Sequence, residues 1–452
     1  MPDVIMPKMG DGMETGTLLA WKKSDGDVVK SGETIAEIQT DKSIVEIEAE
    51  ESGVLHTSIS EGESVPVGVV IATIGAGNGS AAHSAAVPSS AAPTGNGSHA
   101  PIEPTPVVPP VAAPRPTTQP YTGSTINIAY REAIQMALAE ELDRDPSVFL
   151  LGEEIGQYQG TFKITQGFLQ KYGPERIVDT PISEGGMVGM MTGAAMLGLR
   201  PVMEFMTFNF ALVAWDQIVN HTAKMYYMSG GQYSVPCVMR GPAGVGTQLS
   251  AQHSQEITHW FANIPGLKVV APATAADAKG LLKAAIRDNN PVVFMEHAKL
   301  YSIKGDVPED PDFVIPIGVA EIKRVGRDVT IVGYSRNTVL ALQAAEKLAE
   351  EGIDAEVVDM RSMQPYDLET ILESVRKTHR AVVVHEQWPQ YGVASEFAAQ
   401  ISEKAFDDLD APVERVMGQF VSMPYSAALE DLATPHVRDI VAAAKKTLER
   451  SL

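Results

Sequence analysis

A single glutamate stands in an unusually apolar part of the sequence, where its chemistry needs an explanation. The stretch VDTPISEGGMVGMMTGAAMLGL (178–199) reads as a helix made mostly of Gly, Ala, Met and Leu, and Glu184 opens that helix. A carboxylate in such surroundings costs free energy unless something pairs with it. Either the helix macrodipole favours Glu184 at the helix start, or Glu184 is a functional acid, held protonated or strongly hydrogen-bonded.

The residues around this helix leave room for a partner. Its small side chains would allow close approach by another helix, another subunit or a flat ligand. The segment EFMTFNF (204–210) follows, and its aromatic residues would ordinarily be core, although one of them could stack on a heterocycle. Farther along, His253 lies in the polar segment AQHSQ (251–255). Judged alone, such a histidine is more often structural.

A second candidate position is a lone lysine between two repeated segments. EIQTDKSIVEIE (37–48) alternates apolar and polar residues, breaks at Thr40-Asp41-Lys42-Ser43 and resumes, which predicts a hairpin with Lys42 at its tip. Most lysines at hairpin tips are simply exposed and soluble. Here, however, residues 14–38 are echoed by residues 51–74 on either side of the hairpin. The repeat predicts two small antiparallel units packed as a flattened sandwich with quasi-two-fold symmetry.

Composition excludes several classes of function. At 452 residues the chain is long enough for two to four domains, and its formal charge of −22 argues against binding to nucleic acid or anionic membranes. Cys237 is the single cysteine, which suits a reducing compartment. The start of the chain resembles neither a signal peptide nor a transit peptide, and residues 187–199 favour a buried helix over a membrane span. We therefore expect a cytoplasmic bacterial protein or a processed organellar one.

The rest of the chain alternates helices with buried strands. An Ala/Pro/Ser-rich linker, which we expect to be extended and mobile, separates this region from the repeats. Beyond it, helices are predicted at 130–142 and 273–287, the second capped by Thr274, and strands at 148–152, 235–241, 267–272 and 291–297. A second block of the same kind begins near residue 328, after a Pro/Asp-rich boundary at about 301–320. Alternation of this kind predicts parallel sheets with helices on both faces.

Residues 1–75 resemble a lipoyl domain, and Thr40-Asp41-Lys42-Ser43 matches the hairpin to which lipoate is attached. The resemblance implies that Lys42 carries lipoate in amide linkage, placed there by a lipoate-attaching enzyme. A related family attaches biotin to a lysine between two methionines. Met6-Pro7-Lys8-Met9 suggests that pattern, but it lies outside the repeat and we set it aside.

Residues 125–452 resemble the beta subunit of the thiamine-dependent pyruvate dehydrogenase component. The motifs that carry the resemblance are DTPISE, EFMTFNF, YYMSGG, AQHSQ, PGLKVV and AIRDNNPVV. It implies that Glu184 hydrogen-bonds the aminopyrimidine of thiamine diphosphate, that Phe210 stacks on this ring and that Ile182 contacts it. His253 would face the substrate or the incoming lipoyl group as a proton donor. The family also holds a structural potassium ion mainly through backbone carbonyls, at positions matching Cys237, Ala285, Ile286, Asp288 and Asn290.

An absence in the sequence implies a partner. Enzymes of this class anchor magnesium diphosphate through Gly-Asp-Gly followed by Asn, but the only Gly-Asp-Gly is Gly10-Asp11-Gly12, inside the lipoyl-like part. The chain thus has the pyrimidine side of an active site without the diphosphate side. The resemblance implies that an alpha subunit holds Mg²⁺ and the diphosphate in a two-alpha, two-beta heterotetramer.

The resemblances together predict the organisation and activity of the whole chain. The fold is expected to be multidomain, with an all-β lipoyl-type sandwich at 1–75, a disordered linker at 76–124, a thiamine pyrimidine-binding α/β domain at 125–302 and a transketolase C-terminal-type α/β domain at 303–452. The implied reaction is oxidative decarboxylation of pyruvate with reductive acetylation of lipoyl-lysine, in a complex with a dihydrolipoamide acetyltransferase core. Three alternatives remain: a branched-chain 2-oxoacid dehydrogenase beta subunit, an acetoin-cleaving relative, and a lipoyl carrier with an idle C-terminal half.

Overall fold

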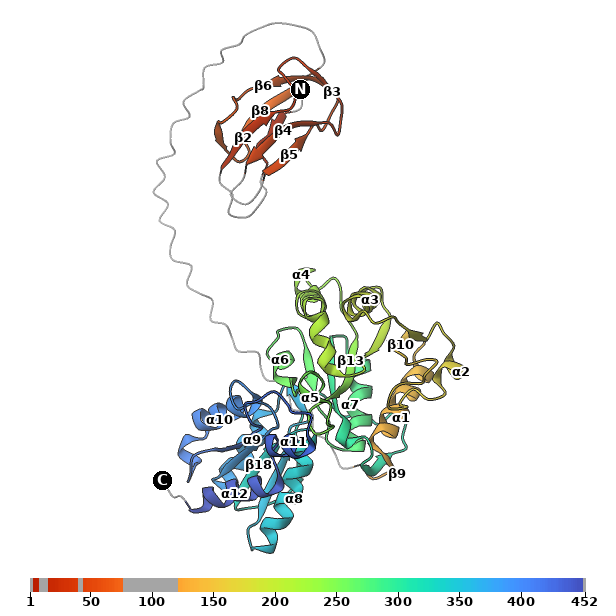
Figure 1. The fold of residues 1–452 in the computed structure, drawn as a ribbon, viewed down its shortest axis with the longest axis vertical. Coiled ribbons are helices and arrows are strands. Elements are labelled where there is room, and N and C mark those ends of the chain that lie inside the picture. Colours follow the sequence, from red (N-terminus) through yellow and green to blue (C-terminus); the bar gives the residue numbers. More distant parts are fainter. Residues whose placement is uncertain (1–2, 8–14, 40–43, 76–120, 450–452) are drawn as a thin grey trace. The chain divides into compact units, whose positions relative to one another are not determined.

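The computed structural model describes residues 3–7, 15–39, 44–75 and 121–449 (Figure 1). The chain divides into two compact units, Met1–Val107 and Val108–Leu452, and each has hydrophobic clusters of its own. In the part of the chain that the structure describes, no helix combines the length and the apolar character needed to cross a membrane.

The first unit is the predicted β-sandwich. Two four-stranded antiparallel sheets have the orders β1-β8-β6-β3 and β5-β4-β2-β7. Trp21 and Ile47 pack against both of the small hydrophobic clusters in this unit. The strands are β1 (Asp3–Ile5), β2 (Thr15–Trp21), β3 (Val28–Val29), β4 (Thr34–Gln39), β5 (Ile44–Glu48), β6 (Gly53–Thr57), β7 (Ser64–Pro66) and β8 (Val70–Gly75).

The sequence repeat appears as matched hydrogen bonds in the two halves of the sandwich. Gly26 N–H donates to the Leu55 carbonyl oxygen (2.8 Å), and the equivalent Gly62 N–H donates to the equivalent Leu18 carbonyl oxygen (2.7 Å). Both glycines have positive φ, +91° and +83°, which side chains rarely adopt and which explains why both halves keep glycine there. The predicted quasi-two-fold arrangement is therefore confirmed.

The strands on either side of the lysine segment pair as a hairpin. Gln39 at the end of β4 lies opposite Ile44 at the start of β5, in antiparallel register. Lys42 itself, with Thr40, Asp41 and Ser43, lies outside the described residues.

The second unit contains two α/β domains, and the first is built on a seven-stranded sheet. Its order is β11-β10-β12-β13-β15-β14-β20, and all pairs are parallel except β14 with β20. Helices α1 and α7 pack on one face, and α3, η1 and α6 on the other, as predicted for a buried parallel sheet. The strands are β10 (Val148–Gly152), β11 (Ile177–Asp179), β12 (Arg200–Glu204), β13 (Val238–Ala243), β14 (Lys268–Val270), β15 (Val292–His297) and β20 (Ser362–Gln364).

The described helices of this domain differ in length: three are long and the others are short. The longer ones are α1 (Tyr130–Arg144), α3 (Glu184–Met196) and α7 (Ala275–Arg287). The shorter ones are α2 (Phe168–Tyr172), the 3-10 helices η1 (Phe208–Ala214) and η3 (Ala298–Leu300), the π-helix η2 (Gln217–Thr222), α4 (Met225–Met228), α5 (Ser250–His253) and α6 (Thr258–Ala262). A two-stranded ladder of β9 (Thr125–Ala129) with β16 (Lys304–Pro308) joins the predicted boundary segment to this first domain.

The second α/β domain has a five-stranded sheet of order β17-β19-β18-β21-β22, with only β17 antiparallel. Its strands are β17 (Glu321–Arg324), β18 (Val329–Gly333), β19 (Ala355–Asp359), β21 (Ala381–Val384) and β22 (Glu414–Val416). Its helices are α8 (Arg336–Glu350), α9 (Leu368–Thr378), α10 (Val393–Lys404), η4 (Phe406–Asp408), α11 (Ala427–Ala433) and α12 (Val437–Glu449).

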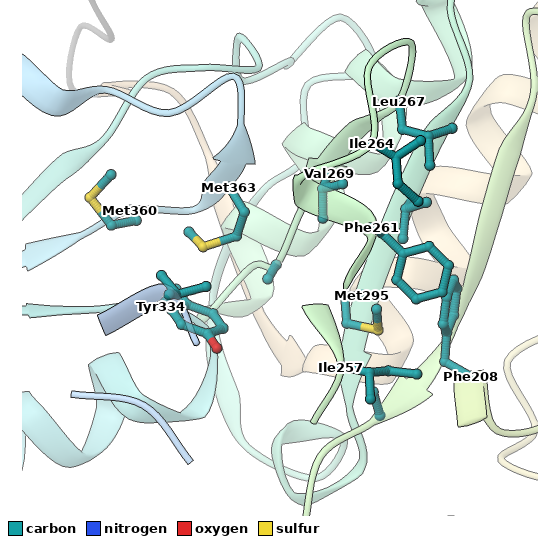
Figure 2. Close-up of a cluster of buried hydrophobic side chains, with 14 of the residues drawn as sticks. Phe208, Ile257, Phe261, Ile264, Leu267, Val269, Met295, Tyr334, Met360 and Met363 are labelled. Atoms are coloured by element: carbon teal, nitrogen blue, oxygen red, sulfur yellow. The ribbon is translucent and has the colours of Figure 1, made fainter. Parts of the chain in front are cut away.

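The two α/β domains share one hydrophobic core. Figure 2 shows Phe208, Phe261 and Met295 of the first domain in the same cluster as Tyr334 and Met360 of the second. Strand β20 also connects the two domains, because it lies in the sequence of the second domain but pairs with β14 of the first. Each domain therefore supports the position of loops in the other.

Candidate functional site

Glu184 is the first residue of α3, and it is buried although the three residues before it are exposed. It is 7% exposed, and its carboxylate has neither a hydrogen bond nor an ion pair with any other described residue. Met187 N–H donates to the Ser183 carbonyl oxygen (2.8 Å), so the helix begins directly at the glutamate. Buried carboxylates normally have partners. One without a partner in the described part of its chain indicates a place where a ligand supplies the missing hydrogen bond.

Four neighbouring strands deliver candidate residues to one edge of the sheet. Strands β11, β10, β12 and β13 run parallel, so their carboxyl ends lie at the same edge. Glu184 follows β11, Phe210 follows β12 and His253 follows β13 along the chain. In open parallel sheets, ligands bind at this edge.

Phe210 and His253 are in contact. Their ring centroids are 4.9 Å apart and the planes cross at 84°, an edge-to-face pair. Phe210 lies on η1, which packs together with α3 in one hydrophobic cluster, and His253 ends α5. The structure therefore brings two of the predicted site residues together, next to the helix that begins at Glu184.

Ile182 is exposed on the surface, unlike an isoleucine of the hydrophobic core. It is 81% exposed, although it lies only two positions before the buried Glu184. An exposed isoleucine beside a partnerless carboxylate fits a position that becomes covered when a ligand or another subunit binds.

Sequence reasoning missed Glu153, which follows β10 at the same edge. Burial raises the pKa of Glu153, and the negative charges of Glu184 and Glu154 raise it further. The sequence does show that Glu153 comes directly after the buried strand VFLLG. It does not show that this strand lies beside the strand that leads to Glu184, so the closeness of the two glutamates could not be predicted.

Two polar side chains that fix loops at the carboxyl edge of the sheet were also not predicted from the sequence. Asp179 accepts hydrogen bonds from Gly156 N–H (2.6 Å) and Gln157 N–H (2.9 Å), which fixes the loop after β10. Asn209 Oδ1 accepts from Gln255 N–H (3.1 Å), which ties η1 to the segment after His253. Both residues connect elements that are distant in sequence, so no local pattern marks them.

A buried charge network lies under the site. Arg240 on β13 donates to Glu204 on β12 and to Glu296 Oε2 on β15 (2.8 Å), and the Tyr301 hydroxyl donates to the same Glu296 oxygen (2.7 Å). Burial raises the pKa of Glu204, while the charge of Arg240 beside it acts in the opposite direction. These paired charges contrast with Glu184, for which the described ranges hold no such partner.

The residues proposed for potassium lie at the opposite edge of the sheet. Cys237 precedes β13, and Ala285 to Asn290 lead from the end of α7 into β15, whose Val292 lies beside Val238. Arg200 Nη1 donates to the carbonyl oxygens of Ile286 (3.0 Å) and Asp288 (2.9 Å).

Two further carbonyl groups of this set, those of Cys237 and Ala285, are also engaged. The carbonyl oxygen of Cys237 accepts from Val292 N–H (2.9 Å), and that of Ala285 accepts from Asp288 N–H (3.3 Å). A carbonyl oxygen has two lone pairs, so the set is compatible with an ion without being specific for one. Within the described ranges, no group of three or more His, Cys, Asp or Glu side chains could hold a metal. Gly10-Asp11-Gly12 lies outside those ranges.

Three known families match the chain, and each match covers one of its three folded domains. Residues 2–74 match the family described as biotin-requiring enzyme. Residues 126–304 match the pyrimidine-binding domain of transketolase, and residues 318–440 match the transketolase C-terminal domain. A solved chain titled "Split gene transketolase, inactive beta4 tetramer" superimposes with a TM-score of 0.59 at 28% identity, covering 73% of this chain and 100% of that one.

Two relatives of this chain are subunits of the same enzyme component. The Rhizobium meliloti pyruvate dehydrogenase E1 component subunit beta is 46% identical over 459 residues, 98% of each chain, and so shares the N-terminal domain as well. The mitochondrial E1 component subunit beta of Homo sapiens is 51% identical over 329 residues, 72% of this chain and 92% of that one. This chain belongs to the family of pyruvate dehydrogenase E1 component beta subunits.

Proposed function

We propose that this chain provides the pyrimidine side of a thiamine diphosphate site that decarboxylates pyruvate, and that an alpha subunit provides the diphosphate side. The observation that carries the proposal is Glu184, a residue only 7% exposed whose carboxylate has no hydrogen bond or ion pair among the described residues. It lies at the sheet edge where Phe210 and His253 meet. The matched motifs and the named relatives support the same assignment.

The side chains divide the work by chemical type. Thiamine diphosphate, when bound, supplies a carbon nucleophile and an electron sink for loss of carbon dioxide from a 2-oxo acid. Glu184 hydrogen-bonds the aminopyrimidine and supports the proton transfer that activates it. Phe210 provides an aromatic face for that ring, and Ile182 covers it. His253 would donate a proton to the substrate or to the incoming lipoyl group.

The other half of the site belongs to a partner in this proposal. Residues 125–452 contain no Gly-Asp-Gly, so Mg²⁺ and the diphosphate are assigned to the alpha subunit of a two-alpha, two-beta heterotetramer. Exposed apolar side chains near α3 support a subunit interface there. They include Ile182, Met190, Leu197 and Val213.

The N-terminal domain makes the same chain an acceptor of the product. We assign lipoate to Lys42, attached by a lipoate-attaching enzyme. As the two-carbon unit is oxidised to acetyl, the lipoyl disulfide is reduced, with one sulfur taking the acetyl group and the other a proton. The acetyl group then passes to coenzyme A through a dihydrolipoamide acetyltransferase core. We place the assembly in the bacterial cytoplasm. We propose the domain limits 1–75, 76–124, 125–302 and 303–452. We assign K⁺ to the carbonyl set of Cys237, Ala285, Ile286, Asp288 and Asn290.

Glu184→Gln tests the proposal directly. The full chain, assembled with its alpha subunit, is assayed for pyruvate-dependent release of carbon dioxide, beside branched-chain 2-oxo acids and acetoin as competing substrates. Glutamine keeps the shape but cannot exchange the proton, so the rate on pyruvate should fall by roughly 10²–10⁴-fold. Glu346→Gln, on the exposed face of α8, is the matched control and should leave the rate unchanged. An unchanged rate in Glu184→Gln would reduce the C-terminal half to a scaffold for a lipoyl carrier.

A further inference from the structure

The segment that carries His253 is a closed loop. The loop consists of residues 244–255 and begins directly after β13. Its two ends are joined by a hydrogen bond from Gly244 N–H to the Gln255 carbonyl oxygen (3.3 Å). Within the loop, Gln248 and Ser250 have φ values of +57° and +65°. Such values are unfavourable for residues other than glycine and persist only where the surroundings hold the backbone.

Glu430, from the other α/β domain, provides that hold. It lies on α11 and is 4% exposed. Its Oε1 accepts from the N–H groups of Gly246 (3.1 Å) and Gln248 (3.1 Å), and its Oε2 also accepts from Gln248 N–H (3.2 Å). Among the described residues, no basic side chain forms an ion pair with it. A buried carboxylate needs compensation, and here the N–H groups of the loop supply it.

Other contacts hold the loop near its two ends. Near the start, Val245 packs against Met423 and Ala433 of the second α/β domain. At the end, Asn209 of the first α/β domain accepts a hydrogen bond from Gln255 N–H (3.1 Å). His253 lies on α5, between these two contacts along the chain. The loop that carries His253 is therefore held by contacts from both α/β domains, and those from the second domain include Glu430.

We propose that Glu430 is a positioning residue for His253. Its carboxylate holds the Gly246 and Gln248 amides, and through them keeps the His253 ring against Phe210. This inference rests on the proposed function, because it assumes that His253 takes part in the reaction. Charge-assisted hydrogen bonds to backbone N–H groups are stronger and shorter than neutral ones. A catalytic group displaced by about 1 Å can lose about 10²-fold in rate.

The test is a double-mutant cycle on the full chain assembled with its alpha subunit. The measured quantity is the rate of pyruvate-dependent lipoyl acetylation, with kcat and KM for pyruvate separated. Glu430→Ala should lower kcat by about 10- to 100-fold and leave KM nearly unchanged. Glu430→Gln keeps one oxygen within reach of both amides and should recover most of the loss. Asp431→Asn removes the neighbouring, exposed carboxylate and serves as the charge-matched control.

The decisive comparison is made in a His253→Ala background. If Glu430 acts through His253, Glu430→Ala should lower the rate of that variant by no more than about twofold. An equal loss in both backgrounds, or no loss in the parent, would overturn the inference. Failure of the proposed function is distinguishable, because His253→Ala itself would then retain the parent rate.

Hydrogen exchange keeps the inference testable if Glu430→Ala does not fold. In Glu430→Met, which keeps the volume of the side chain but removes both acceptor oxygens, amides of residues 244–255 should exchange faster than in the parent, while Glu430→Gln and Asp431→Asn should change them little. Unchanged exchange of that loop in folded Glu430→Met would also overturn the proposal.

Discussion

Glu184 and Glu204 are both buried glutamates next to the same sheet, yet their surroundings differ. Glu204 receives a hydrogen bond from Arg240, whereas Glu184 has no partner among the described residues. A buried polar group without a partner costs stability, and functional residues are often held at such a cost. The difference between the two glutamates therefore predicts opposite effects of the same substitution.

Glu184→Gln should raise the free energy of unfolding of the full chain, measured without added cofactor, by about 1 kcal/mol. The neutral amide is cheaper to bury than an unpaired carboxylate. Glu204→Gln, the matched control, should lower it by roughly 1.5–3 kcal/mol, because Arg240 loses a charged acceptor. Denaturant unfolding of both variants checks the prediction. Destabilisation by Glu184→Gln would indicate a structural role in the free chain.

His385 predicts how stability depends on pH. Burial lowers the pKa of His385 to about 4, and its Nε2 has no partner among the described residues. The unfolded chain takes up a proton there near pH 6.5, so between pH 6.5 and 4 the unfolded state holds more protons and stability falls as the pH falls.

The expected slope from this one residue is about 1.4 kcal/mol per pH unit within that window. In His385→Asn the free energy of unfolding should fall less steeply between pH 6.5 and 4. The comparison is of slopes, because the substitution also changes packing. His221→Asn, at an exposed position, is the control. The same slope in parent and His385→Asn would contradict the prediction.

Helix α7 illustrates what a local pattern can determine. Its apolar periodicity and its cap are both visible in the sequence, and the structure confirms them: Thr274 Oγ1 accepts from Asp277 N–H (3.1 Å). Strand β10 was likewise predicted at its observed limits, since a short apolar run between polar segments reads as a buried strand.

Thr274→Ala should lower the free energy of unfolding by about 1 kcal/mol, because one N–H group at the helix start loses its acceptor. Thr274→Ser keeps the hydroxyl and should have a much smaller effect. Thermal or denaturant unfolding distinguishes the two. An equal loss in both variants would assign the effect to the methyl group and not to the cap.

Features that depend on distant pairing were not predictable in this way. Strand β16 falls in the segment expected to be a boundary, because nothing local indicates that it pairs with β9. Strand β13 begins at Val238 and not at Val235, since only the later residues have partners in the sheet. Glu153 and Glu430 were missed for the same reason. Glu184, Phe210 and His253 were found because motifs mark them, and their roles stay predictions.

At the scale of the whole molecule, the proposed function gives one chain both an acceptor domain and half of an active site. Covalent connection raises the effective concentration of the lipoyl group near the site without any new contact. The full-length similarity to the Rhizobium meliloti subunit shows that this arrangement is shared. The central claim is therefore that the chain both produces and receives the acetyl group, and that it does so only with a partner.

The mass of the Lys42 peptide tests this claim most directly. It is measured on natively purified protein before and after adding pyruvate, thiamine diphosphate and Mg²⁺, with and without the alpha subunit. We expect a lipoyl group on Lys42 that becomes acetylated only when the alpha subunit is present. An unmodified Lys42, or a lipoyl group that is never acetylated in the complete assembly, would contradict the account.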